Sequence, residues 1–215
     1  YSHTTLSLPI SLVSATVWDN VDCLFLHRGS MDDSQPYLKS TILHQWLFGY
    51  ELPDTVMLLT KNGHVYMLAT NKKIAFVKAG VDQFDKLKSK KSKIQKIHLL
   101  TRNKEDGNAA HYATLAQAAG LDKENAAATK KVRAGILVKE QALNTKGLLG
   151  PWEEQLRSHE SVEIVDVDKG FNFLLATKDE LEADLLKKSS VFSHKVMKRG
   201  FVKKLEEIID DLARF

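Results

Sequence analysis

Two short apolar runs separated by an Asn-Gly turn constrain this chain more than any other part of its sequence. The runs are Thr55–Thr60 and His64–Ala69, and Lys61-Asn62-Gly63 joins them. Asn-Gly supplies the positive φ angles that a tight hairpin turn requires. The sequence therefore predicts an antiparallel β-hairpin at residues 55–69, so the fold contains a β-sheet.

Further strands and helices alternate around this hairpin. Short apolar runs predict strands at residues 21–27, 97–100, 132–138 and 162–167. Helices are predicted at residues 38–50, from an N-cap at Asn71 through residue 77, at residues 108–120 with Gly120 as the C-cap, and at residues 152–159. This alternation indicates an α/β domain with a mixed sheet and flanking helices.

The predicted helix at residues 38–50 has large apolar side chains at three- and four-residue spacing. They are Leu38, Ile42, Leu43, Trp46 and Leu47. We expect this face to be buried, so that Trp46, Leu47 and Phe48 serve a mainly structural role. His44 on the same helix is expected to be hydrogen-bonded or at the surface, and not to bind a metal ion.

Composition narrows the class of protein. The 215 residues suffice for one sizeable core, and the net charge of +4 is too small to mark a dedicated nucleic-acid binder. No apolar run approaches the ~20 residues of a membrane span, so no membrane partner is expected. The single cysteine, Cys23, cannot form an internal disulfide, which fits a reducing compartment such as the cytosol or nucleus.

The usual signatures of catalytic and cofactor sites are missing from the sequence. It contains no glycine-rich phosphate loop, no GxSxG elbow, and no HExxH or CxxC spacing among its eight histidines. Asp32 and Asp33 are adjacent, but a cation site requires more oxygen ligands. We therefore predict no catalytic residue, no metal ligand and no cofactor.

One segment is strongly basic. It contains Lys86, Lys88, Lys90, Lys91, Lys93 and Lys96, with no acidic residue among them. Repulsion between these charges favours a mobile, solvated connection. Two alternatives stay open, which are a phosphate contact with DNA and a nuclear-import signal.

The segment at residues 37–52 resembles a stretch near the start of the large subunit of the FACT histone chaperone. The residues that carry this resemblance are Lys39, Ser40, Thr41, Trp46, Leu47, Phe48, Gly49, Tyr50 and Glu51. Asn71-Lys72-Lys73 with Phe76 is similar to a lysine-rich helix start in that family. Residues 185–197 resemble the helix that opens its second lobe.

The resemblance implies the small amino-terminal lobe of a creatinase-like or aminopeptidase-like (pita-bread) architecture without peptidase activity. It further implies a nuclear, chromatin-associated module that binds core histones and contributes to nucleosome reorganisation in transcription, replication and repair. The other FACT subunit and replication or transcription factors are implied as partners of the full-length protein, and DNA contact is expected to be weak or indirect. The alternative is the amino-terminal lobe of a metal-dependent proline aminopeptidase or creatinase-like hydrolase.

The character of the sequence changes near Ala176. We expect an α/β lobe at residues 1–176 and, at residues 177–215, a charged helix that begins a second lobe. Its apolar residues form two stripes: Leu181, Leu185, Phe192 and Val196, and then Phe201, Val202, Leu205, Ile208, Ile209 and Leu212. The stripes face different directions, so we expect a bend at Gly200 or two different partners.

Overall fold

The structure is a computed structural model that describes residues 17–29, 37–88, 92–121, 131–141 and 148–214. The elements in chain order are β1 (Cys23–Arg28), α1 (Lys39–Phe48), β2 (Thr55–Thr60), β3 (His64–Ala69), α2 (Asn71–Leu87), β4 (Lys96–Thr101), α3 (Ala109–Ala118), β5 (Val132–Ile136), α4 (Val138–Gln141), α5 (Leu149–Ser158), β6 (Val162–Asp166), α6 (Asp168–Ala176), α7 (Glu180–Val196), the π-helix η3 (Met197–Val202) and α8 (Lys203–Ala213). The chain divides into two compact units, Tyr1–Leu174 and Leu175–Phe215.

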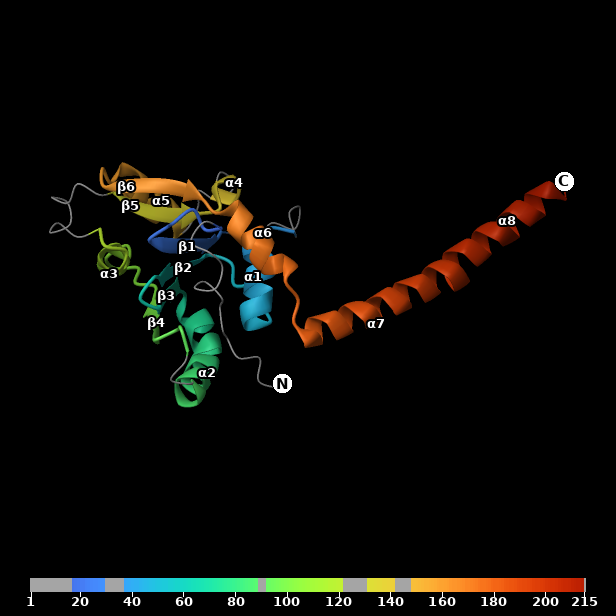
Figure 1. The fold of residues 1–215 in the computed structure, drawn as a ribbon, viewed down its shortest axis with the longest axis horizontal. Coiled ribbons are helices and arrows are strands. Elements are labelled where there is room, and N and C mark those ends of the chain that lie inside the picture. Colours follow the sequence, from blue (N-terminus) through green and yellow to red (C-terminus); the bar gives the residue numbers. More distant parts are fainter. Residues whose placement is uncertain (1–16, 30–36, 89–91, 122–130, 142–147, 215) are drawn as a thin grey trace. The chain divides into compact units, whose positions relative to one another are not determined.

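The first unit contains a six-stranded mixed sheet in the order β4-β3-β2-β1-β5-β6 (Figure 1). The pairs β1–β2 and β2–β3 are antiparallel, whereas β3–β4, β1–β5 and β5–β6 are parallel. Only β2 therefore runs against the other strands. The predicted fold class, a mixed α/β sheet with flanking helices, is confirmed.

Helices cover both faces of this sheet, and alternate residues of the central strands supply the two cores. On β1, Leu24 and Leu26 pack towards α1, α2 and α6, while Cys23 and Phe25 pack towards α3 and α5. This two-sided burial explains why the central strands have continuous apolar sequences. Burial also raises the pKa of the Cys23 thiol to about 12, so Cys23 is an inert core residue.

The predicted hairpin is present as β2 and β3. Gly63 has φ of 81°, whereas Asn62 is not in the positive-φ region, so the glycine alone provides the unusual backbone conformation. A Cβ on Gly63 would also lie 2.2 Å from the Lys93 carbonyl oxygen. The Gln95 N–H donates to the Gly63 carbonyl at 2.8 Å, which joins the turn to the segment leading into β4.

Two of the predicted helix caps are displaced by one residue. Thr70 is the N-cap of α2 and Asn71 is its first helical residue, so the predicted cap is wrong. At the end of α3 the C-cap is Ala119, and Gly120 follows it with φ of 82°. The Leu121 N–H donates to Ala116 and the Gly120 N–H to Gln117, which is a Schellman motif with glycine at its left-handed position.

Helices α5 and α6 also differ from the prediction. Helix α5 begins at Leu149, so Gly150 and Pro151 lie in its first turn instead of preceding it. Proline is tolerated there because the first N–H groups of a helix have no partner within the helix. Helix α6 was not predicted, although its Phe171 and Leu174 are buried in the core.

The second unit is continuously helical from Glu180 to Ala213. Asp179 and Glu182 form a capping box at the start of α7. The π-helical segment Met197–Val202 contains Gly200, at the position where the sequence predicted a bend. No residue of α7, η3 or α8 is buried, so both apolar stripes are exposed along the described part of this unit. The assignment of this helix to a second lobe stays a prediction.

We expect Gly170→Ala to destabilise the first unit by about 1–3 kcal/mol, because a Cβ there would overlap a buried ring. The added Cβ would lie 2.3–2.8 Å from three atoms of the Trp18 ring. Gly80→Ala on α2, where no atom lies within 4 Å, should instead stabilise by about 0.5–1 kcal/mol. Chemical denaturation of both variants measures the two changes. Equal effects of the two substitutions would contradict this packing.

Candidate interaction site

Helix α1, which carries most of the family-like residues, has a polar buried face. Ser40, Thr41, Leu43 and His44 are buried. Ile42 and Trp46 are 38% and 37% exposed, so the predicted apolar face packs inward only in part, and the expected burial of Trp46 is wrong. Leu47 and Phe48 are partly buried against the core. Gly49 ends the helix as predicted, with φ of 69°.

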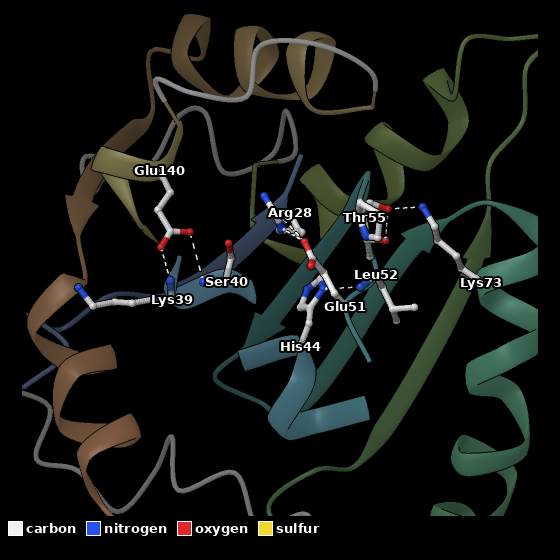
Figure 2. Close-up of polar contacts among 10 residues, drawn as sticks. Arg28, Lys39, Ser40, His44, Glu51, Leu52, Thr55, Lys73 and Glu140 are labelled. Atoms are coloured by element: carbon white, nitrogen blue, oxygen red, sulfur yellow. Dashed lines mark hydrogen bonds and ion pairs between the residues drawn. The ribbon is translucent and has the colours of Figure 1, made fainter. Parts of the chain in front are cut away.

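The N-terminus of α1 is capped by a carboxylate from a distant helix. Its N-cap residue, Leu38, has no side-chain acceptor. Glu140 on α4 supplies one: its Oε1 accepts the Lys39 N–H at 2.6 Å and its Oε2 accepts the Ser40 N–H at 3.2 Å. A negative charge at this end is also favoured by the helix dipole. Glu140 therefore fixes the start of α1 against α4 (Figure 2).

The Lys39 side chain joins α1 to α6. Its Nζ forms an ion pair with Asp168, the first residue of α6. The hydrogen bond from Lys39 holds the pKa of the Asp168 carboxyl below its usual value. Lys39 thus contributes a backbone N–H to one helix and a charge to another, so it has a structural role in this lobe.

A buried ion pair lies beneath α1. Arg28, at the end of β1, is 1% exposed. Its Nε and Nη2 lie 2.7 Å and 2.5 Å from the same oxygen of Glu51. Its Nη1 is buried with no hydrogen-bond partner among the described residues. A buried guanidinium depends on its carboxylate, so Glu51 of the motif holds Arg28 in the folded state.

His44 is held neutral between α1 and the following loop. Its Nδ1 accepts the Leu52 N–H at 3.4 Å, so the ring proton of the neutral form is assigned to Nε2. Burial, with the nearby Arg28 charge, lowers the pKa of His44 to about 4. Figure 2 places His44, Arg28 and Glu51 together. The expectation of a hydrogen-bonded histidine agrees with this arrangement.

The outer part of the motif forms an exposed aromatic surface. Tyr50 is 66% exposed and packs on Phe76 of α2, which is 54% exposed, with ring centroids 5.8 Å apart. Partly exposed Ile42 and Trp46 lie on the neighbouring α1. Exposed aromatic residues are typical of protein-binding surfaces. The motif therefore combines a polar interior that positions α1 with an aromatic exterior available to a partner.

The lysine-rich segment is more ordered at its ends than the sequence predicted. Lys86 lies within α2 and Lys96 within β4. The Lys88 Nζ donates to the Gln95 carbonyl at 2.7 Å. Lys93 lies in the described connection before β4. Lys90 and Lys91 lie outside the described residues, as do Asp32 and Asp33. The DNA contact stays a prediction.

The described ranges offer no site for metal-dependent hydrolysis. Within them, no group of three or more His, Cys, Asp or Glu residues could hold a metal ion.

None of the helices in the described ranges is long and apolar enough to span a bilayer.

Comparison with known proteins identifies the family. The family described as the FACT complex subunit SPT16 N-terminal lobe domain matches residues 8–170. The chain belongs to this family. The resemblance based on the residues of α1 is therefore confirmed for most of the chain.

Individual SPT16 proteins give the same result. FACT complex subunit SPT16 from Dictyostelium discoideum is 30% identical over 196 residues, 91% of this chain and 17% of that protein. FACT complex subunit spt-16 from Caenorhabditis elegans is 33% identical over 175 residues, 80% of this chain and 15% of that protein. This chain thus spans less than a fifth of either SPT16 relative.

A solved structure has the same fold. The N-terminal domain of FACT complex subunit SPT16 from Cicer arietinum (chickpea) matches with a TM-score of 0.71 and 26% identity. The match covers 91% of this chain and 41% of the chickpea chain. The lobe therefore has the fold of SPT16 N-terminal domains, which is aminopeptidase-like.

Sequence reasoning did not find the residues that hold α1 from outside the motif. Arg28, Glu140 and Asp168 contact α1 or its following loop from other parts of the chain. Glu140 is 100 residues from Ser40 in sequence. No local spacing links such distant positions. The one available sequence signal was Arg28, a charged residue at the end of an apolar strand.

We expect Glu51→Gln to lower the free energy of unfolding by about 3 kcal/mol, because it leaves the buried Arg28 charge without its partner. The matched control is Glu163→Gln, whose partner is Arg133 and whose side chain is 46% exposed. The control should cost less than about 1 kcal/mol. Urea denaturation at neutral pH measures both. Similar losses in the two variants would show that Arg28 does not depend on Glu51.

His44 should make the stability of the lobe depend on pH. Its folded-state pKa of about 4 lies below the ordinary value of 6.5. The unfolded chain therefore binds more protons between these values, and stability falls as pH decreases from about 6.5 to about 4. The contribution of His44 is on the order of 3 kcal/mol. His44→Gln should reduce this pH dependence, whereas His194→Gln on exposed α7 should leave it unchanged. An unchanged slope in His44→Gln would contradict the assignment.

Proposed function

We propose that this chain is a non-catalytic protein-binding module of a FACT-type histone chaperone that contacts core histones. The membership of residues 8–170 in the SPT16 N-terminal lobe family is the observation that carries the proposal. The module acts in the nucleus on chromatin, in nucleosome reorganisation during transcription, replication and repair. The other FACT subunit and replication or transcription factors engage the longer protein.

The aromatic surface at Tyr50 and Phe76 supports a binding role. Two large rings in contact remain more than half exposed on the lobe. The residues beneath them hold α1 through an ion pair and through hydrogen bonds from other elements, so the surface is presented by a fixed helix. Rigid aromatic anchors bind a partner at low entropic cost. DNA is at most a weak or indirect partner through the lysine-rich segment.

The rival function is peptide hydrolysis by an aminopeptidase-like protein. The described residues supply no group of three or more potential metal ligands, and the cysteine of the chain is buried with a raised pKa. The fold is therefore used here for recognition. No cofactor takes part in the proposed function.

Histone binding is tested by titrating this chain with each of the fluorescently labelled core histone heterodimers, and with peptides of the histone tails. We expect at least one of these to bind. The double variant Tyr50→Ala with Phe76→Ala should weaken binding by about tenfold or more, because exposed aromatic anchors often dominate an interface. Phe173→Ala on α6, which removes another exposed ring, is the control.

Two outcomes count against the proposal. If the chain binds none of the core histones or tail peptides at low salt, it does not form a histone-binding surface. Chelator-sensitive cleavage of an Xaa-Pro dipeptide would favour the hydrolase.

A further inference from the structure

Two histidines that are far apart in sequence meet at the edge of the sheet. His64 lies on β3 and His98 on β4, which pair in parallel, with Tyr66 opposite His98. The His64 Nδ1 and the His98 Nε2 are 3.0 Å apart. Both residues are partly exposed. Their separation of 34 residues matches no metal-ligand spacing, so no sequence pattern indicates this pair.

The surroundings restrict the orientation of both rings. The imidazole planes differ by 18° and their centroids are 5.3 Å apart, so the two nitrogens point towards each other. The Tyr66 ring stacks on His98 with centroids 4.3 Å apart and planes at 5°. The backbone positions are fixed by two hydrogen-bonded strands. The two strands therefore hold both imidazoles within reach of one ion before it binds, and ring rotation is the remaining adjustment.

We propose that His64 and His98 form a surface site for a divalent first-row transition-metal ion, best suited to Cu²⁺, in which water completes the coordination. Imidazole nitrogens bind such ions at about 2.0–2.1 Å. Two nitrogens 3.0 Å apart then subtend about 91–97° at the metal. That is the angle between neighbouring ligands in tetragonal Cu²⁺ sites, whereas tetrahedral Zn²⁺ requires about 3.4 Å.

Both rings can bind the ion without losing a proton overall, because the proton between them can move to an outer nitrogen. In the neutral pair one inner nitrogen carries a proton and donates it to the other nitrogen. The metal ion takes the place of this shared proton after both rings turn, and the displaced proton moves through solvent to the outer nitrogen of the same ring. Burial and the nearby Lys96 charge lower the pKa of His98, which favours the neutral form that binds metals.

The site is open and simple in composition. Two protein ligands leave the remaining positions to water, so the affinity is modest and the site is not the hydrolytic centre that the alternative function requires. The proposal does not rest on histone binding.

Calorimetric titration of the whole 215-residue chain with Cu²⁺, together with EPR, tests the site. All samples carry His3→Gln, because a free amino terminus two residues before a histidine also chelates Cu²⁺. We expect one principal Cu²⁺ per chain with two nitrogen ligands. His64→Gln and His98→Gln each remove one ligand, so each should weaken Cu²⁺ binding by about tenfold or more. Loss of a residue that only orients a ligand already has an effect of this size. His194→Gln should bind as the parent does.

A measurement on the parent chain guards against misfolded variants. Substoichiometric Cu²⁺ should broaden the imidazole NMR signals of His64 and His98 before those of the other histidines. Equal affinity in the parent and both variants, or broadening that begins at His111, His159 or His194, would overturn the proposal and leave the pair as a hydrogen bond alone.

Discussion

The fold depends on burial of the two central strands on both faces. Because side chains alternate along a strand, β1 and β2 each supply apolar residues to two separate cores, and neither core can form without helices on its own side. This requirement explains the three-layer arrangement and the need for long crossovers between parallel neighbours. It also explains the close packing at Gly135, where a Cβ would lie 2.7 Å from atoms of Leu24 and Val167. The position of α1, and with it the exposed aromatic surface, follows from this framework.

Much of the fold could be predicted from the sequence because its signals are local. The hairpin depends on Gly63, and the end of α1 on Gly49, both within a few residues of the elements they terminate. The inward face of α1 could not be predicted, because apolar periodicity assumes that the interior is apolar. Here the interior contains the buried Arg28, and the polar residues Ser40, Thr41 and His44 are buried on α1 while Trp46 is partly exposed. Periodicity cannot detect a charge contributed by another strand.

The candidate site shows the same limit in another form. The motif residues of α1 were found from a resemblance, but their partners come from helices that start about 100 and 130 residues later. Lys39 and Glu51 are charged residues whose partners lie within the lobe, so the motif specifies the position of α1 as much as any contact with another protein. Substitution of either residue would displace the helix, so any loss of the proposed binding would be indirect. An effect on function at these positions therefore does not identify a contact residue.

The wide turn at Met197–Val202 has a consequence for the apolar side chains on either side of it. In an α-helix of uniform pitch, the stripe around Leu205 would be rotated by about 205° along the chain from the stripe around Leu185. The i→i+5 segment turns less per residue and removes about 100° of rotation over its length. The two stripes are thereby left roughly a quarter-turn apart. The π-helical segment thus accommodates about one extra residue without rotating the helix that follows it. A single partner surface can therefore contact both stripes.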